Sequence, residues 1–327
     1  MPIFDGMVVG AYAASPAHRE WEPAAEHAFY EGLAAVPSIG ALELPWMGAI
    51  HPHDPSWLSA NLPSRFGAVV TDIPHTMSRL AADPAYGLAS VDADGRHAAL
   101  VDVARMRNDI RGLNETQARR VVGAVELHTA PRGTAGSPDA LAASLTEIAG
   151  WDWDAAQLVI EHCDTWHPDR MPEKGFLDLG VEIDAIEYSG AAVGISLNWG
   201  RSVIEGRSAT VAVDHARAAA EQGVLRGFIA SGVADVETAF GSAWIDAHLP
   251  FAASAATPRG TPGSLMTAQH VADVFAVAGD LDWIGVKVGV AAPCSVADRL
   301  AVVIESLGVL TESARISRLH DAREGKP

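Results

Sequence analysis

The sequence predicts a single parallel (β/α)8 barrel of α/β class, and three observations support this prediction. The 327-residue chain contains eight short apolar segments that are typical of buried parallel strands. A helix-length or connecting segment follows each of them. Eight such units over this length match a (β/α)8 barrel. An open doubly wound sheet is the alternative, but it usually has a glycine-rich phosphate turn after its first strand, and YAASP is not one.

The predicted strands are short and apolar along most of their length, as expected for strands that are covered on both faces. Segments such as GAVVTDI, VVGAVEL and VGISL show this character most clearly. The eight predicted strands span residues 7–13, 40–44, 67–73, 121–127, 157–161, 193–197, 227–230 and 283–288.

The predicted helices carry apolar residues at three- and four-residue spacing, which gives each helix one buried face. In the first helix Ala25, Phe29 and Leu33 share that face. Ser295 and Asp298 resemble a capping pair at the start of the last helix. The predicted helices span residues 21–35, 96–113, 138–149, 180–188, 209–222, 267–278 and 295–307, and the short segment 51–63 lies between the second and third strands.

One domain accounts for nearly the whole sequence. No internal repeat and no low-complexity segment interrupts the alternation of strands and helices. The residues after Glu312 are polar. We therefore expect a barrel over residues 1–312 and a polar C-terminal tail over residues 313–327.

The charge balance bears on the partners of the protein. The chain has 23 basic and 41 acidic residues and a formal net charge of −18, without a run of Lys or Arg. A phosphate backbone would be repelled by this field. We therefore expect no nucleic-acid partner and a small-molecule ligand instead.

The N-terminal segment and the hydropathy of the chain bear on its location. Residues 1–16 have neither a basic region nor a long apolar core, so we do not expect them to form a signal peptide. No segment approaches the roughly 20 apolar residues of a membrane span. The two cysteines, Cys163 and Cys294, do not indicate a disulfide framework. We expect a cytoplasmic protein that does not bind membranes, and a homo-oligomer is compatible with these features.

Polar and ionisable residues follow most of the predicted strands. In (β/α)8 barrels the active site forms at the carboxyl ends of the strands. This pattern therefore predicts a site at that edge. The residues concerned are Glu43, Trp46, His51 and His53; Asp72 and His75; Glu126 and His128; Glu161, His162 and Asp164; Asn198, Trp199 and Arg201; Ser231; and Lys287.

Glu126, Glu161 and Lys287 are the predicted catalytic residues. Each glutamate lies in an apolar strand and therefore needs a partner when it is buried. The functional interpretation is a general acid and base pair, and the structural alternative is a salt bridge to a nearby arginine. Lys287, in GVKVG, would pair with one of the glutamates, form a Schiff base or lie at a water-filled mouth.

The other residues at the strand ends are candidates for substrate binding. Arg201 could clamp an anionic group through its planar guanidinium, or it could be an ordinary loop charge. Tryptophan faces suit sugar rings, but they also simply pack, and histidines in such loops often only bond to the backbone. The predicted substrate-binding residues are Glu43, Trp46, His51, His128, His162, Asn198, Trp199 and Arg201.

Several sequence segments resemble known proteins. The architecture resembles the xylose-isomerase-like barrels, a superfamily of sugar isomerases, epimerases and metal-dependent endonucleases. The segments VVGAYAASP, LELPW, VELHTAPR, IEHCD and EKGFL resemble, more closely, an uncharacterised actinobacterial family of unknown function. The superfamily resemblance implies a sugar-like substrate. The closer one implies no activity.

The superfamily resemblance also implies a divalent metal. In its sugar epimerases the ligands are a Glu, an Asp, a His and a Glu on strands five to eight. Only Glu161 matches this set, because Asn198, Ser231 and Lys287 end the other three strands. A rearranged site for Mn, Zn or Mg would use Glu126, His128, Glu161 and His162.

The leading hypothesis is a sugar, or anionic sugar, isomerase or epimerase. Glu126 and Glu161 would act as acid and base, and Lys287 or a metal would stabilise the enediolate. Arg201 and Asn198 would hold polar groups of the substrate. Two alternatives stay open: a lyase, aldolase or glycosidase that uses Lys287 or the glutamate pair, and a non-catalytic sugar-binding barrel.

Overall fold

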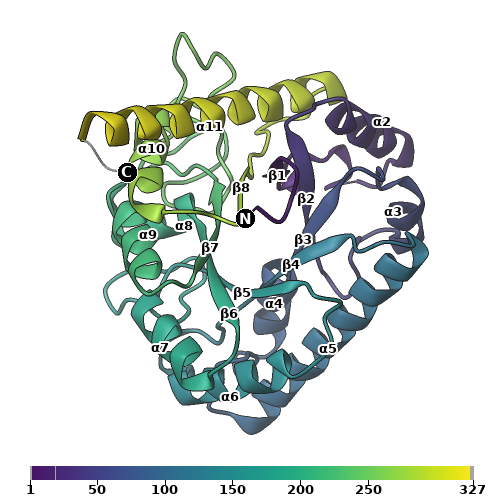
Figure 1. The fold of residues 1–327 in the computed structure, drawn as a ribbon, viewed down its shortest axis with the longest axis vertical. Helices are drawn as coiled ribbons and strands as arrows, with labels where there is room; N and C mark the ends of the chain where they lie inside the picture. Colours follow the sequence, from purple (N-terminus) through teal and green to yellow (C-terminus); the bar gives the residue numbers. More distant parts are fainter. Residues whose placement is uncertain (1, 19, 325–327) are drawn as a thin grey trace. The chain divides into compact units, whose positions relative to one another are not determined.

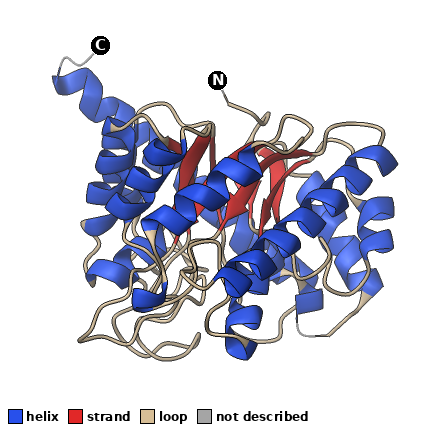
Figure 2. Ribbon diagram, turned by 90° about the horizontal axis from the view of Figure 1, so that it is seen from below, coloured by secondary structure: helices blue, strands red, loops and turns tan. Residues whose placement is uncertain are grey.

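The strands form a closed parallel barrel. The computed structural model describes residues 2–18 and 20–324 (Figure 1). Over this part of the chain, eight strands are arranged in the order β1 to β8 around a closed barrel. Each strand is followed by at least one helix along the chain, and Figure 2 shows the helices in blue and the strands in red. The predicted (β/α)8 barrel is therefore confirmed.

The chain divides into two compact units, which we describe separately. The terminal unit contains Met1–Leu42 and Leu197–Pro327, and the central unit contains Glu43–Ser196. No helix among the described residues is long and apolar enough to cross a membrane.

In the terminal unit the strands pair in parallel around β1. Val9 of β1 is in register with Leu42 of β2 on one side and with Val286 of β8 on the other. Ala230 of β7 pairs in turn with Val286. The elements are β1 (Met7–Val9), β2 (Ile39–Pro45, which ends in the central unit), β7 (Leu225–Ala230), β8 (Trp283–Val286), α1 (Ala11–Ala14), η1 (Pro16–His18), α2 (Pro23–Ala34), α8 (Trp199–Gly206), α9 (Val211–Glu221), α10 (Ala268–Ala278) and α11 (Val296–Glu324).

In the central unit β4 pairs with strands on both sides. Thr71 of β3 is in register with Glu126 of β4, and Glu126 is in register with Val159 of β5. The elements are β3 (Gly67–Thr71), β4 (Val122–Leu127), β5 (Gln157–His162), β6 (Val193–Asn198, which ends in the terminal unit), α3 (Pro55–Asn61), α4 (Ile73–Ala82), α5 (Ala93–Thr116), η2 (Gly133–Ala135), α6 (Pro138–Ala149) and α7 (Leu179–Ser189).

Three helices occupy segments that were expected to be loops or strand ends, namely α3, α4 and α8. The residues at the start of each helix explain why it forms. The Asp54 carboxylate caps α3 by accepting from the Trp57 amide, and Asn198 caps α8 in the same way. Pro55 and Pro74 lie at the first turns of α3 and α4, where a proline costs no hydrogen bond. These residues are helix starts as well as turn formers.

The predicted boundaries change at three places. The strand expected over residues 7–13 ends at Val9, and α1 follows it. Lys287, expected inside the last strand, lies one residue beyond β8. Helix α11 continues past residue 307 and includes residues 313–324 of the expected tail, because Leu310, Ser313 and Ser317 bury one side of it. The barrel boundary at residue 312 stays a prediction.

Candidate functional site

Three glutamates converge in the central unit at the ends of β2, β4 and β5. Glu43, Glu126 and Glu161 each bring one carboxylate oxygen to within 4.8 Å of the other two. Their side chains are nearly completely buried. The sequence predicted Glu126 and Glu161 as a pair, and the structure adds Glu43, which had been expected only to bind substrate. We refer to these three residues as the glutamate cluster.

Hydroxyl groups hold two members of the glutamate cluster in place. Ser196 Oγ donates to Glu126 Oε1 at 2.8 Å, and Thr71 Oγ1 donates to Glu161 Oε2 at 2.5 Å. Bonds of this kind stabilise the ionised form of a carboxyl group and restrict its rotamer. The two predicted catalytic glutamates therefore have fixed positions.

The charges of the glutamate cluster oppose one another. Two unit charges 4.8 Å apart repel by roughly 3 kcal/mol at the effective dielectric constant that suits most protein sites. A proton or a cation among the three groups lowers this repulsion. An oxygen-only set of this kind suits Mg or Mn better than softer metals. Chemically, the cluster can take up and release protons or hold a hard cation.

His128 and Asp72 face each other beside the cluster. His128 Nε2 lies 3.8 Å from Asp72 Oδ2, and His128 Nδ1 accepts from the Ala130 amide at 3.2 Å. Burial is the main cause that lowers the pKa of His128 to about 3. Burial, and then the charge of Glu161, raises the pKa of Asp72 well above its usual value. The histidine is therefore neutral, with its proton on Nε2.

A second cluster of polar side chains surrounds Asp102 of α5. The Asp102 carboxylate lies 3.0 Å from His75 Nε2 and 3.2 Å from Arg79 Nε, and it accepts from the Tyr86 hydroxyl at 3.3 Å. The hydrogen bond and charge of His75 and the charge of Arg79 lower the pKa of Asp102, against the opposing effect of its burial, which is the largest single contribution. The Tyr86 ring in turn stacks on His128, with 5.8 Å between centroids. This group fixes the His128 ring.

His162 points away from the glutamate cluster. Its Nδ1 lies 2.8 Å from Glu182 Oε2 of α7, and Glu182 Oε1 accepts from the Thr129 hydroxyl. Neighbouring residues of a strand face opposite sides, so Glu161 and His162 cannot both reach the cluster. Cys163 is buried, and its Sγ contacts the Glu161 carbonyl at 3.5 Å.

Trp46 and His51 make structural contacts in the central unit. The Trp46 indole donates from Nε1 to Asp109 Oδ2 at 2.7 Å, and its ring packs edge-on against His75. His51 Nδ1 accepts from the amides of His53 and Asp54. Burial lowers the pKa of His51 to about 4. These contacts are those of a packed tryptophan and of a histidine that organises a loop.

In the terminal unit, Lys287 is completely buried beside a glycine. A Cβ atom on Gly10 would lie 2.7 Å from Lys287 Cγ, so only glycine leaves room for this side chain. Lys287 Nζ lies 5.3 Å from the centroid of the Tyr12 ring. The geometry is that of a cation–π contact.

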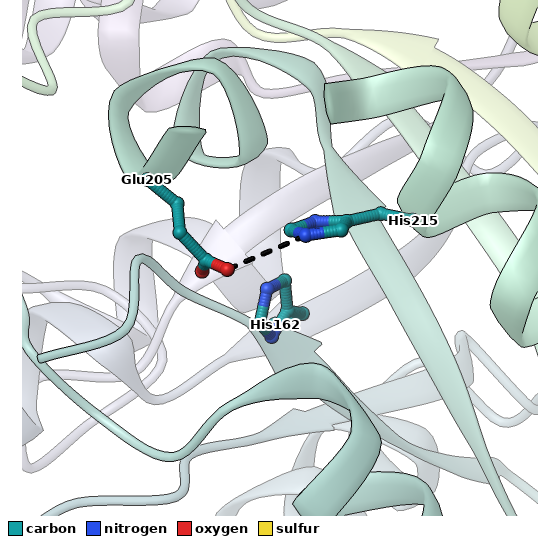
Figure 3. Close-up of side chains that lie close together, drawn as sticks. All are labelled: His162, Glu205 and His215. Carbon is teal, nitrogen blue, oxygen red and sulfur yellow. Dashed lines mark ion pairs between the residues drawn. The ribbon is translucent and has the colours of Figure 1, made fainter. Parts of the chain in front are cut away.

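The remaining predicted residues cluster at the ends of β6 and β7. Arg201 Nε donates to Asp246 Oδ2 at 3.0 Å, so its charge is already compensated. Asn198 caps α8 through its side-chain oxygen, and Trp199 stacks on His270. On α8 and α9, Glu205 and His215 form an ion pair with a 3.3 Å separation (Figure 3). His162, also drawn there, belongs to the central unit.

Ser231, His248 and Asp246 resemble a nucleophile relay but do not form one. Ser231 Oγ lies 3.0 Å from His248 Nδ1, and Asp246 Oδ1 lies 3.3 Å from the same nitrogen. A relay needs the serine and the carboxylate on opposite ring nitrogens. This group therefore orders the connection after β7 and does not activate Ser231.

The epimerase metal set does not fit this chain. Glu161 ends β5, but Asn198 ends β6, Ser231 follows β7 and the buried Lys287 follows β8. An ammonium group cannot be a metal ligand. The rearranged set is not assembled either: Glu126 and Glu161 meet Glu43, whereas His162 contacts Glu182 and His128 faces Asp72. The residues that could hold a cation in the central unit are the three glutamates.

Several residues of the site were missed by the sequence analysis. Thr71 and Ser196 are polar residues near the ends of apolar strands, and this pattern could have identified them. Glu182 lies on the face of α7 that also carries the buried residues Ala185 and Ile186. This spacing predicts a buried carboxylate and could have identified Glu182. Asp246 lies in an irregular connection that gives no such signal.

Solved structures share this fold. The fold is similar to that of xylose-isomerase-like barrels, as the sequence resemblance predicted. An L-ribulose 3-epimerase structure is 14% identical, with a TM-score of 0.62 and 99% of each chain covered. A D-psicose 3-epimerase structure, determined with D-fructose, is 13% identical with a TM-score of 0.55, covering 96% of this chain and 98% of that one. A xylose isomerase domain-containing protein from Salmonella typhimurium LT2 is 11% identical with a TM-score of 0.59, covering 94% and 97%.

The chain belongs to the family described as a domain of unknown function (DUF4862), whose model matches residues 8–302. The uncharacterized protein STM3670 of Salmonella typhimurium (strain LT2) is 32% identical over 320 residues. These residues cover 95% of this chain and 98% of that protein. Membership of a family without a known activity agrees with the resemblance found in the sequence.

Proposed function

We propose that this protein is a carbohydrate-active enzyme of the sugar isomerase or epimerase type, with a small sugar or sugar acid as its substrate. The observation that carries the proposal is the glutamate cluster, in which three buried carboxylates converge from β2, β4 and β5. Proton abstraction beside a carbonyl needs such a base in a site that excludes water. The barrel shared with sugar epimerases supports this choice.

The spacing of the cluster favours proton transfer on one face of the substrate. Two groups on opposite sides of one carbon, each about 3–3.5 Å from it, would be up to about 6–7 Å apart. One oxygen each of Glu126 and Glu161 lies within 4.8 Å of the other. Such a pair is better suited to moving a proton between adjacent carbons along one face, which is an aldose–ketose isomerisation. The spacing is also shorter than the roughly 6.5–9.5 Å of inverting glycosidases, whereas it is close to the roughly 5–5.5 Å of retaining ones.

In this mechanism Glu126 and Glu161 have distinct roles. Glu161, which accepts from Thr71, removes the proton from the carbon beside the carbonyl, while Glu126 holds the proton that the cluster shares and delivers it to the carbonyl oxygen. Glu126 then takes the proton of the neighbouring hydroxyl group, and Glu161 returns its proton to the former carbonyl carbon, which gives the isomer and restores both carboxyl groups. The hydroxyl groups of Thr71 and Ser196 keep each carboxylate in its rotamer while the charge moves. Stabilisation of the enediolate by Lys287 stays a prediction from the sequence.

Deuterium exchange tests the proposal across a range of candidate substrates. A panel of aldoses, ketoses and sugar acids would be incubated with the protein in D2O, and deuterium beside the carbonyl would be followed by NMR. We expect exchange with at least one sugar, and a fall of at least about a hundredfold in Glu126→Gln and Glu161→Gln. Glu147→Gln, on the exposed side of α6, is the control and should exchange normally.

Two results would contradict the proposal. Exchange that persists in both glutamine variants would remove the glutamates from the chemistry. Sugar binding without exchange in any panel member would favour the non-catalytic alternative.

A further inference from the structure

Polar atoms without hydrogen-bond partners gather at the junction of β3, α4 and β4. Within the described chain, Asp72 Oδ1, Thr76 Oγ1 and His128 Nε2 are buried and make no hydrogen bond. Thr76 lies one turn after Asp72, so both belong to the same side of the first turn of α4. Buried polar groups in native proteins are nearly always satisfied by protein or by ordered water. These unsatisfied atoms on facing residues therefore point to a bound polar group.

His128 Nε2 is the hydrogen-bond donor at this junction, and Asp72 Oδ2 is the acceptor that faces it. His128 Nδ1 accepts from the Ala130 amide, so the neutral ring carries its proton on Nε2. The facing atom is Asp72 Oδ2, an acceptor, at 3.8 Å. That distance is too long for a direct hydrogen bond. A group that bridges them must accept from nitrogen and donate to oxygen, and a hydroxyl group does both.

The surroundings hold the His128 ring and the Asp72 backbone in place. The His128 ring is fixed on one edge by the Ala130 amide and on one face by the stacked Tyr86 ring. Asp72 precedes α4, where its amide donates to the Glu126 carbonyl and its carbonyl accepts from the Thr76 amide. The separation is therefore part of the fold.

We propose that Asp72 and His128 form a buried binding site for one hydroxyl group, supplied by water in the free protein and by a polyol ligand when one is bound. Thr71, the residue before Asp72, donates to Glu161 of the glutamate cluster. The site therefore adjoins the carboxylate that we assign as the base. A sugar held there by one hydroxyl would present a neighbouring carbon to Glu161. This placement of the sugar rests on the proposed function, whereas the hydroxyl site itself does not.

Nuclear Overhauser measurements on the His128 Nε2 proton test the site directly. Histidine-labelled protein would be studied alone and with saturating xylitol, an unreactive polyol, and His128→Phe would assign the signal. We expect a cross-peak from this proton to water in the free protein and to xylitol carbon-bound protons in the complex. A water cross-peak that persists in the presence of xylitol supports the site with water as the source. A proton on Nδ1, or a signal in contact with neither water nor xylitol, overturns the proposal.

Binding affinities provide the second measurement. His128→Phe keeps an aromatic ring against Tyr86 but loses the Nε2 donor, so xylitol affinity should fall about tenfold, the effect of one hydrogen bond. Tyr86→Phe keeps the ring stack and should change the affinity less than about twofold. Equal losses of xylitol affinity in both variants would show that His128 only packs. They would contradict the proposal that a xylitol hydroxyl group occupies the site. A protein that does not bind xylitol or any sugar would contradict the proposed function, while the water cross-peak would still decide the hydroxyl site.

Discussion

His162 Nδ1 lies 2.8 Å from Glu182 Oε2, and both side chains are buried. The other oxygen of Glu182 accepts from the Thr129 hydroxyl at 2.6 Å. One carboxylate of α7 therefore fixes His162 at the end of β5 and Thr129 after β4, and it directs the His162 ring away from Glu161. Carboxylate–imidazole pairs of this kind set the tautomer and orientation of a histidine.

Glu182→Ala is predicted to lower the free energy of unfolding by about 3 kcal/mol, because both donors would be left buried without an acceptor. Urea unfolding monitored by circular dichroism measures this change. Glu187→Ala, an exposed position on the same helix, is the control and should change stability by less than about 0.5 kcal/mol. Similar values for the two variants would show that the pair contributes nothing.

The stability of the protein should depend on pH through His128. Its pKa is lowered from 6.5 to about 3 in the folded protein, so the unfolded chain binds the proton first as pH falls. The free energy of unfolding therefore decreases from pH 6.5 towards pH 3, by about 1.4 kcal/mol per unit from this residue. Asp72, whose pKa is raised, acts in the opposite direction.

The difference between variants isolates the His128 contribution. Between pH 6.5 and pH 5 the wild-type protein should lose about 2 kcal/mol more than His128→Phe, measured by urea unfolding at each pH. Gly112→Ala, which removes no ionisable group, is the control and should keep the wild-type dependence. If the slope of His128→Phe matched that of the wild type, His128 would be free to ionise in the folded protein.

Two glycine substitutions should change stability in opposite directions. Gly10→Ala places a Cβ atom 2.7 Å from Lys287 Cγ, and this overpacking should cost about 1–3 kcal/mol. Gly112→Ala lies in the exposed interior of α5 with nothing within 4 Å, and it should stabilise by about 0.5–1 kcal/mol. Thermal unfolding of both variants checks the signs. A neutral Gly10→Ala would mean that the Lys287 side chain has room to move.

Local sequence signals predicted most of the elements. Strands that are buried on both faces appear as continuous apolar runs, and the helix at 138–149 has the predicted bounds because Ser137 caps it and Pro138 begins it. Helices α3, α4 and α8 were missed because their caps and prolines were interpreted as turn residues. Position along a strand also brought Glu126 and Glu161 together correctly.

The partners of the site residues could not be predicted in the same way. Thr71 and Glu161 are 90 residues apart, and Arg201 and Asp246 are 45 apart. Such pairs depend on which strands and loops are neighbours, and a local pattern does not contain that information. His128 and His162 were therefore grouped with the glutamates by sequence proximity, whereas their hydrogen bonds lead to Ala130 and Glu182.

Trp46 tests whether a strand-end tryptophan packs or binds a ligand. Its indole N–H donates to Asp109 Oδ2 at 2.7 Å while its ring is buried against His75. Asp109→Ala should lower the free energy of unfolding by about 2 kcal/mol, because the buried N–H loses a charged acceptor. Trp46→Phe removes the N–H donor, so adding Asp109→Ala to that variant should change the free energy of unfolding little. A double-mutant cycle by urea unfolding should then give a coupling of about 1.5 kcal/mol. A coupling near zero would mean that the N–H does not depend on Asp109, and it would contradict the packing role.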